Sequence, residues 1–242
     1  MTFSPDDHLF PPAVTTLPLL SAQGEALPHT WPVNRVFCIG RNYADHAREM
    51  GHDPSREPPF YFSKPSTALF NQPATFPLPS YSSQVEYEVE VVIGLTKGGK
   101  NLSLEQAKGA VGAIGIGLDM TCRDRQKEAK TAGRPWDLAK GFDHSAPVSP
   151  LQLLSFPDIS ARYESFNLTH NGRIAQQGQI SAMIWSIPEL IVVISQQMAL
   201  CEGDIIMTGT PAGVGPVSAG DTLIATLEHF PVPLTIDVVA SR

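Results

Sequence analysis

Residues 88–94 read EVEVVIG, a stretch in which acidic and β-branched residues alternate before the chain becomes wholly apolar. This pattern is typical of a β-strand with one polar face. Glu88 and Glu90 are two positions apart, so in a strand their side chains project from the same face. Neighbouring carboxylates repel each other unless a positive charge lies between them, and a hard divalent cation meets that need. The stretch predicts either a metal-binding strand or the solvated face of an edge strand. Glu86, on the same face, leaves the register open.

A second predicted strand, residues 111–118, has glycine at positions 112, 115 and 117, which is typical of a strand packed closely in the interior. Asp119 follows directly, where a strand end can point a carboxylate into a cleft. With two glutamates, Asp119 would leave about half of a roughly octahedral magnesium shell open for water or substrate. Pattern alone thus predicts a three-carboxylate metal site, with solvated acidic residues as the alternative.

The composition limits the class of protein. A chain of 242 residues, 42% of them hydrophobic and 17% charged, is long enough for one large domain with a substantial core. The formal charge of −7, without a basic stripe, argues against nucleic-acid binding. Cys38, Cys122 and Cys201 are scattered, so we expect neither a disulfide framework nor a zinc ribbon, and a reducing cytosol. The acidic N-terminus is unlike a signal peptide, and no apolar run is long enough to span a membrane, which favours a cytoplasmic protein without membrane contact.

The N-terminal part of the chain changes character near residue 30. Prolines interrupt residues 1–30, which we expect to form an extended arm or short strands. Val36 to Gly40 predicts a strand, and residues 43–50 predict a helix with Gly51 at its C-terminal cap.

The remaining chain is expected to be rich in strands, with a few short helices. Ser103 and Gln106 fit a capping box at a helix start, and residues 188–200 predict an amphipathic helix. Hairpin turns are predicted at Asn171-Gly172 and at residues 219–221.

Six short motifs together resemble the fumarylacetoacetate hydrolase family. They are GRNYADH (40–46), KPST (64–67), YEVE (87–90), LDMTCRD (118–124), LAK (138–140) and GDIIMTGTPAGVG (203–215). The resemblance covers roughly residues 33–238 and implies a strand-rich α+β fold. We expect a mixed β-sandwich or roll of the kind found in the C-terminal domain of that family, with a few short helices. The expected organisation is an N-terminal arm, 1–30, and a single catalytic domain, 31–242.

The resemblance also implies a metal site. In this family a glutamate pair precedes an aspartate by a fixed interval, and that interval selects Glu88 and Glu90 with Asp119 rather than Glu86 with Glu88. The implied cofactor is Mg²⁺ or Mn²⁺, with no organic cofactor, and the implied assembly is a homodimer.

His46 and Glu49 are three positions apart on the expected helix, so they share a face and can hydrogen-bond. A carboxylate beside an imidazole raises its basicity and fixes its orientation, as a general base requires. A surface pair is the alternative, and the resemblance implies that the pair activates water. Gly40 and Gly51 bracket the helix, which leads to the hypothesis that it closes as a lid. Lys140 is predicted to stabilise a developing enolate or oxyanion. Its alternative is an ordinary surface lysine.

Five further residues are predicted to bind substrate. A helix beginning after Asp119 would return Arg123 and Gln126 to the metal side, where similar enzymes hold the substrate carboxylate and carbonyl. The alternative is a solvated helix face shared with Arg125, Lys127 and Lys130.

The other three lie elsewhere in the motifs. Thr210 belongs to a glycine-rich turn that lacks the lysine of a P-loop, so we expect its backbone N–H groups and the Thr210 hydroxyl to approach a small anion rather than a nucleotide. The alternative is a purely structural hairpin turn. Lys64 is predicted to meet a distal substrate carboxylate, or else to end a strand. Arg41 is predicted to bind substrate from the first motif.

Within the family, residues 45–60 and 133–149 are similar to those of the small acylpyruvases. The predicted reaction is hydrolysis of the C–C bond of a 2,4-dioxo acid, with 3-fumarylpyruvate giving fumarate and pyruvate as the leading case. The alternatives are oxaloacetate decarboxylation, isomerisation of an oxo-diene dicarboxylate, and a metal-stabilised binding protein without catalysis. His46 and Glu49 together favour hydrolysis, because decarboxylation gives them little to do.

Overall fold

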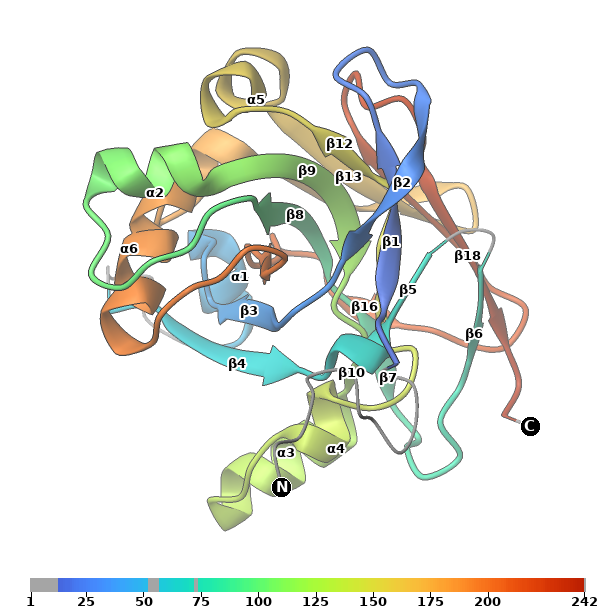
Figure 1. Ribbon diagram of the computed structural model, residues 1–242. Helices are drawn as coiled ribbons and strands as arrows, with labels where there is room; N and C mark the ends of the chain where they lie inside the picture. The colour runs from blue at the N-terminus through green and yellow to red at the C-terminus, as the bar shows by residue number, and fades with distance from the viewer. Residues whose placement is uncertain (1–12, 52–56, 72–73, 242) are drawn as a thin grey trace, which may run out of the picture.

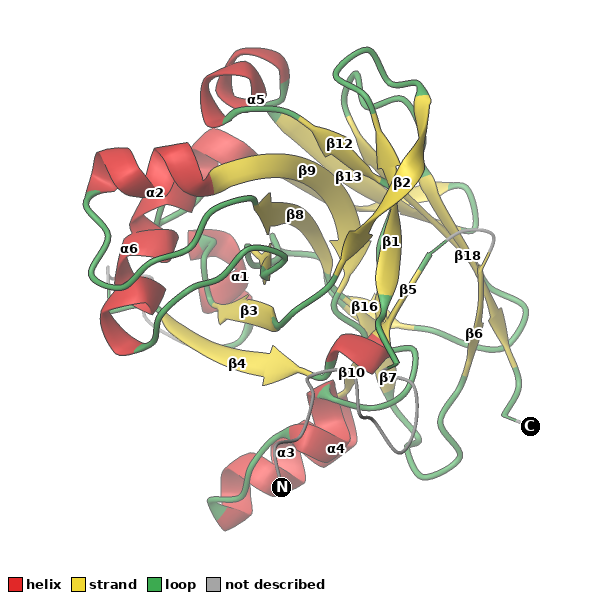
Figure 2. Ribbon diagram, in the orientation of Figure 1, coloured by secondary structure: helices red, strands yellow, loops and turns green. Residues whose placement is uncertain are grey.

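The computed structural model describes residues 13–51, 57–71 and 74–241 of the chain. Strands dominate the fold, and short helices lie around them (Figures 1 and 2). The longest α-helix in the described residues has 11 residues. The predicted fold class, strand-rich α+β, is confirmed.

The centre of the fold is an eight-stranded mixed sheet in the order β2-β1-β12-β9-β8-β15-β3-β4. Its strands are β1 (Thr16–Leu20), β2 (Ala26–Pro32), β3 (Val36–Gly40), β4 (Phe60–Lys64), β8 (Val89–Leu95), β9 (Val111–Leu118), β12 (Leu151–Leu153) and β15 (Ile205–Met207). Every residue of β8 is buried. Val91 and Ile93 pack into one apolar cluster and Val92 into another, because side chains alternate along a strand. Glu90 shares the face of Val92, so the predicted polar face of this strand lies in the interior and the solvated edge strand is excluded.

A five-stranded sheet packs on the large sheet, in the order β14-β13-β17-β18-β6. Its strands are β6 (Ala74–Pro77), β13 (Ser165–His170), β14 (Arg173–Gln179), β17 (Thr222–Leu227) and β18 (Leu234–Val239). The larger apolar cluster joins the two sheets, with Phe76, Phe166 and Ile236 from one and Ile116 from the other. Two small sheets complete the fold: β10 (Thr121–Cys122), β7 (Val85–Tyr87) and β16 (Gly215–Pro216) form one, and β11 (Ala146–Pro147) and β5 (Leu69–Phe70) form the other.

The helices lie at the periphery of the sheets. They are α1 (Ala44–Glu49), α2 (Leu104–Ala110), α3 (Arg123–Ala132), α4 (Asp137–Lys140), α5 (Phe156–Arg162) and α6 (Ile187–Gln197), with two 3₁₀ turns, η1 (Ser66–Ala68) and η2 (Ile180–Ala182). In Figure 1, α2 lies beside α6, and α3 and α4 project together at the other end of the molecule. The predicted capping box of Ser103 and Gln106 is present, and Gly51 follows α1 at a φ of +77° as predicted for its C-terminal cap.

One of the two predicted hairpins is wrong. Asn171 and Gly172 join β13 to β14 with φ of +51° and +75°, as a two-residue hairpin turn requires. Residues 219–221 form a turn between β16 and β17, which belong to different sheets. Here the Asp221 carboxylate accepts the backbone N–H of Ser218, so a local side-chain bond holds the turn without strand pairing.

The predicted arm contributes strands to the large sheet. β1 pairs antiparallel with β2 and parallel with β12, and β2 runs past residue 30. Residues 1–12 lie outside the described residues, and the division into an arm and a catalytic domain stays a prediction. Among the described residues, no helix is long and apolar enough to cross a membrane.

Truncating the core between the sheets should cost stability. Ile116 in β9 is fully buried, whereas Ile174 in β14 is 61% exposed. We expect Ile116→Ala to lower the free energy of unfolding by about 2–5 kcal/mol, because it loses apolar burial and leaves a cavity. The matched Ile174→Ala should stay within about 0.5 kcal/mol of the parent chain. Denaturant titration followed by circular dichroism measures both, and equal losses would contradict this placement of the core.

Candidate metal centre and active site

Backbone pairing brings the three predicted metal ligands together. β8 runs antiparallel to β9 with Glu90 opposite Gly117. Beyond these strands, the N–H of Asp119 donates to the carbonyl of Glu88 at 2.8 Å. Gly117 allows this packing, because a Cβ there would lie 3.1 Å from the carbonyl oxygen of Pro147. The glycine pattern of β9 therefore lets the chain approach closely behind the acidic residues.

Glu88, Glu90 and Asp119 are buried, and one carboxylate oxygen from each lies within 4.8 Å of the other two. Asp119 Oδ1 accepts no hydrogen bond from the described residues. Burial raises the pKa of Glu90 well above its usual range, and the charges of Asp119 and Glu88 raise it further. A cation among the three would oppose this repulsion, and carboxylate oxygens suit Mg²⁺ and Mn²⁺. The residues therefore fit a divalent metal ion.

Lys140 and Arg123 neutralise part of this charge. Lys140 Nζ donates to Glu88 Oε2 at 2.8 Å and to Asp119 Oδ2 at 2.7 Å. Arg123 donates to Glu88 Oε1 and to Glu86 Oε2, both at 2.6 Å. Burial alone would raise the pKa of Glu88, but Lys140 and Arg123 outweigh it and hold that pKa well below its usual range. Glu86, the third acidic residue of this stretch, is thus bonded to Arg123 rather than grouped with Asp119.

Lys64 lies behind the carboxylates. Its Nζ is 2.8 Å from Asp119 Oδ1, outside hydrogen-bond geometry, and donates to the carbonyls of Met120 and Lys140. The side chain is fully buried at the end of β4 and does not line the pocket over the carboxylates. The structure therefore does not bring Lys64 to the position from which it was predicted to meet a substrate carboxylate.

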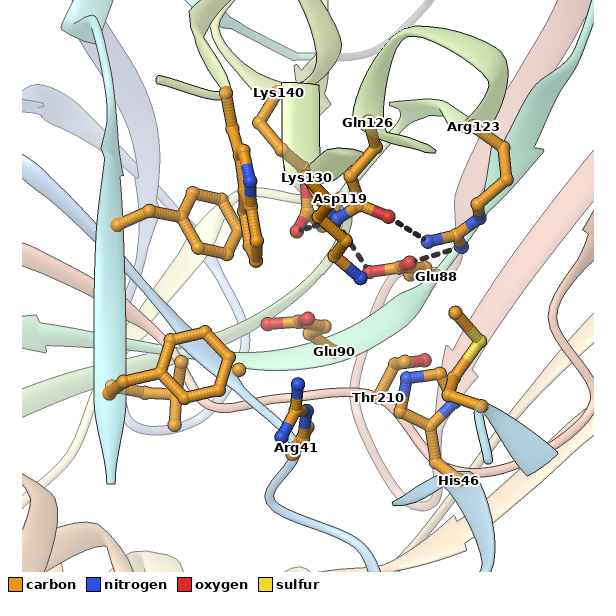
Figure 3. A pocket seen from close by; sticks show the side chains of 16 residues that line it. Arg41, His46, Glu88, Glu90, Asp119, Arg123, Gln126, Lys130, Lys140 and Thr210 are labelled. Carbon is orange, nitrogen blue, oxygen red and sulfur yellow. Dashed lines mark hydrogen bonds and ion pairs between the residues drawn. The ribbon is translucent and has the colours of Figure 1, made fainter. Parts of the chain in front are cut away.

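α1 brings the predicted base to the pocket. His46 Nδ1 lies 3.4 Å from Glu49 Oε2, and the His46 ring lines the pocket. In Figure 3, His46 and Lys140 lie on opposite sides of the view, with Glu88 and Glu90 between them. Burial lowers the pKa of His46, and Glu88 and Glu49 only partly offset this effect. The imidazole is therefore neutral near pH 7 and able to accept a proton.

The glycine-rich turn of residues 208–215 uses its N–H groups inside the protein. Gly209 N–H donates to Glu90 Oε2 at 2.9 Å, and Gly213 N–H donates to Glu49 at 3.2 Å. Gly209 has a φ of +99°, and a Cβ there would lie 2.7 Å from that of Asn42, so only glycine fits. These two groups, predicted to approach a small anion, thus position the carboxylates of the site itself.

The pocket over the carboxylates contains most of the predicted substrate-binding residues. The lining residues predicted from the sequence are Arg41, His46, Glu88, Glu90, Asp119, Arg123, Gln126, Lys140 and Thr210. Gln126 accepts a hydrogen bond from Arg123 at 2.7 Å, and the Thr210 hydroxyl accepts one from Gln176 at 2.8 Å. Glu49 lies outside the lining and touches it through His46.

Part of the pocket wall was not predicted from the sequence. The residues that were not assigned are Ile39, Gly40, Met50, Phe60, Phe62, Lys130 and Trp136. Lys130 follows Arg123 by seven positions and Gln126 by four, so the helical period places all three on one face of α3. That signal was present, and the solvent exposure expected for Lys130 on a solvated helix face is observed as well. The aromatic residues come from separate segments, and no spacing connects them.

The chain belongs to the fumarylacetoacetate hydrolase family. Residues 35–235 match the family described as fumarylacetoacetate (FAA) hydrolase C-terminal. With this family and this site, the chain is an enzyme.

Similar proteins carry several activities in their names. The oxaloacetate tautomerase YcgM of Escherichia coli is 39% identical over 82% of this chain and 90% of its own length. The mitochondrial oxaloacetate tautomerase FAHD1 of Bos taurus is 41% identical over 81% of this chain and 87% of its own. Among solved structures, fumarylpyruvate hydrolase from Pseudomonas aeruginosa, in complex with Mn²⁺ and pyruvate, aligns with a TM-score of 0.88. It is 38% identical and covers 97% of this chain and 100% of its own.

Removing one ligand charge should abolish tight metal binding. Glu90→Gln keeps the side-chain shape but loses a negative charge beside Asp119 and Glu88. Because outer partners of a metal site already contribute about 10–100-fold to affinity, we expect Mn²⁺ affinity to fall by about 100-fold or more. Isothermal titration calorimetry measures the loss.

The control for this experiment is Glu86→Gln. Glu86 bonds to Arg123 and lies outside the group of three carboxylates, so Mn²⁺ affinity should fall by at most about 10-fold. Equal losses in the two variants, both still folded by circular dichroism, would show that the ligand set is misassigned.

Proposed function

We propose that the chain is a metal-dependent hydrolase that cleaves the C3–C4 bond of an acylpyruvate, with 3-fumarylpyruvate giving fumarate and pyruvate. The observation that carries the proposal is the His46–Glu49 pair, whose imidazole lines the same pocket as the three carboxylates. A fumarylpyruvate hydrolase that shares the fold, and was crystallised with Mn²⁺ and pyruvate, supports it.

Glu88, Glu90 and Asp119 would hold Mg²⁺ or Mn²⁺, which when bound supplies Lewis acidity toward the oxygens of an oxo acid. The remaining chemistry belongs to the side chains around this centre. Gln126 and Arg123, on α3, line the same pocket and would orient the carboxylate and carbonyl of the substrate.

His46 acts as the general base. A carboxylate such as Glu49 only accepts hydrogen bonds, so His46 carries its proton on Nδ1 and donates it to Glu49 in a hydrogen bond. The lone pair on Nε2 is then free for a water molecule. His46 removes a proton from that water, and the hydroxide forms a bond to C4 of the substrate. Glu49 is itself held by the N–H of Gly213, which fixes the orientation of the pair.

The C3–C4 bond then breaks, and its electron pair passes into the enolate of pyruvate. Lys140, buried against Glu88 and Asp119, keeps positive charge beside the place where that enolate forms. The proton taken from water is available to C3, so the products are pyruvate and the carboxylate of the acyl fragment.

A second candidate is oxaloacetate tautomerisation, which the names of the relatives at 39% and 41% identity favour. Tautomerisation moves one proton between C3 and the C2 oxygen, and a single base such as His46 suffices. Tautomerisation needs no attacking water, so it depends less than hydrolysis on the orientation of His46 by Glu49. Oxaloacetate decarboxylation is a further case, named for a mitochondrial relative from Dictyostelium discoideum at 35% identity.

A substrate panel tests the proposal. With Mg²⁺ or Mn²⁺ present, we expect a loss of ultraviolet absorbance of 3-fumarylpyruvate together with release of pyruvate. Acetylpyruvate, maleylpyruvate and oxaloacetate complete the panel, and chelator-treated protein is the control. Faster enol–keto interconversion of oxaloacetate, or faster decarboxylation, than cleavage of any acylpyruvate would replace hydrolysis as the main activity.

The pH profile tests the base. Because burial lowers the pKa of His46 from its usual 6.5, the acid limb of kcat/KM should lie below pH 6.5. Glu49 raises that pKa, so Glu49→Gln should move the limb to lower pH and also reduce kcat. His46→Ala should lose about 10²–10⁴-fold in kcat, the usual contribution of general-base catalysis.

Asp45→Asn is the matched control for Glu49→Gln. Asp45 is on the same helix, and its side chain is 81% exposed and paired with Arg48. Its removal should leave the profile of the parent enzyme. A limb that moves to higher pH in Glu49→Gln would show that His46 is not the group that titrates.

The homodimer and the cytoplasmic location stay predictions. Light scattering of the purified protein measures the oligomeric state.

A further inference from the structure

Three aromatic rings form one wall of the pocket. Phe60 and Phe62 come from β4, and Trp136 precedes α4. The ring centroids of Phe60 and Trp136 are 6.1 Å apart with the planes at 84°, and those of Phe62 and Trp136 are 5.7 Å apart. These contacts hold the rings as one rigid apolar surface beside the carboxylates.

A cationic side chain lies over each of the three rings of this wall. Lys140 Nζ lies 5.1 Å from the centroid of Phe62, and this lysine is already bonded to the metal-site carboxylates. Arg41 lies 5.3 Å from the centroid of Phe60, and Lys130 Nζ lies 5.1 Å from that of Trp136. The last two therefore stand on the aromatic wall and line the pocket without belonging to the ion pairs of the metal centre.

The cations differ in how far acidic residues neutralise them. Arg123 bonds to two glutamates, and Lys140 to a glutamate and an aspartate. Arg41 has only a loose pair with Glu57, 3.7 Å away and 62% exposed, among the described residues. For Lys130, no carboxylate of residues 13–51, 57–71 or 74–241 lies within 4.0 Å. The pocket thus contains positive charge that its described acidic residues do not balance.

Lys130 lines the pocket while remaining exposed to solvent, and the neighbouring cations act on it. Partial desolvation lowers the pKa of Lys130, and Arg123, Arg41 and Lys140 lower it further by repulsion. An anion bound near Lys130 would relieve this repulsion.

We propose that Lys130, with Arg41, binds the distal carboxylate of the substrate and so selects acyl chains that end in a carboxylate over chains that end in an apolar group. The inference rests on the proposed function and adds a specificity residue to it: a planar, unsaturated acyl chain lies against Phe60 and Trp136, and its terminal carboxylate meets Lys130. Lys130 thereby takes the role that the sequence analysis gave to Lys64, which is buried behind the carboxylates. Lys130 is a specificity residue and takes no part in the proton transfer that His46 performs.

Two acylpyruvates that differ only at the distal end isolate this contact. 3-Fumarylpyruvate ends in a carboxylate, and crotonylpyruvate has the same chain with a methyl group in its place. The measured quantity is the ratio of kcat/KM for the first over the second. We expect Lys130→Met to lower this ratio by about 10- to 100-fold, the usual contribution of a hydrogen bond to a charged group.

Two further variants complete the series. Lys130→Arg keeps a cation over Trp136 and should retain most of the ratio. Lys127→Met removes an exposed lysine from the same helix, outside the pocket, and should leave the ratio as in the parent enzyme. A ratio unchanged in Lys130→Met, or lowered equally in Lys127→Met, would overturn the inference.

A binding measurement separates this inference from the proposed reaction. Calorimetry of the Mn²⁺-loaded protein with fumarate and with crotonate should show tighter binding of fumarate, and Lys130→Met should remove the preference. If neither acylpyruvate is cleaved but fumarate is preferred through Lys130, hydrolysis fails and the dicarboxylate site stands. If crotonate binds as tightly as fumarate in the parent protein, the dicarboxylate site is wrong whichever reaction the enzyme performs.

Discussion

The structure depends on keeping three carboxylates ionisable in its interior. Each buried charge loses its hydration, and the penalty is several kcal/mol per ion, on the order found for buried ions generally. Lys140, Arg123 and Lys64 offset part of it through contacts of 2.6–2.8 Å with Glu88 and Asp119. The compensation is uneven: among the described residues, the Glu90 carboxylate accepts a hydrogen bond only from the N–H of Gly209, and its pKa is raised. A site that holds unequal carboxylates in this way is poised to accept a cation.

The need to stabilise buried carboxylates explains the backbone conformation around the site. The N–H of Asp119 bonds to the carbonyl of Glu88, so one strand pairing sets the spacing of two ligands. Gly209 takes a left-handed φ and passes within contact of Asn42 in order to point its N–H at Glu90. The N–H groups of Gly209 and Gly213 therefore serve the acidic residues, whereas Thr210 of the same turn lines the pocket. The residue types that look like a ligand-binding loop are required by the internal electrostatics of the protein.

Only part of this molecule could be predicted from the sequence. Signals between residues close in sequence were sufficient: the capping box at Ser103, the helix that pairs His46 with Glu49, and the buried glycine strand all appear as predicted. Contacts between distant segments were not predictable from spacing, because a lysine at a strand end can face substrate or lie behind the site. Lys64 lies behind the site, whereas Lys130, on α3, lines the pocket and is at the same time exposed to solvent. Likewise, the turn at residues 219–221 contained hairpin residues, but only the tertiary structure assigns its two strands to different sheets.

Charge balance connects the metal centre with the distal end of the pocket. With all groups ionised, Glu86, Glu88, Glu90 and Asp119 exceed Lys64, Arg123 and Lys140 by one negative charge, and a bound divalent ion would reverse that to one positive charge. The pocket also contains the charged residues Arg41 and Lys130. Of these two, only Arg41 has a carboxylate neighbour in the described structure. A monoanionic substrate would neutralise the metal centre and leave the aromatic wall with its cations. A dianionic oxo acid neutralises both the metal centre and the aromatic wall. The chain between its two charges would have to be apolar enough to pack against Phe60 and Trp136. Electrostatic complementarity of this kind favours one length and polarity of substrate without any change in the catalytic residues.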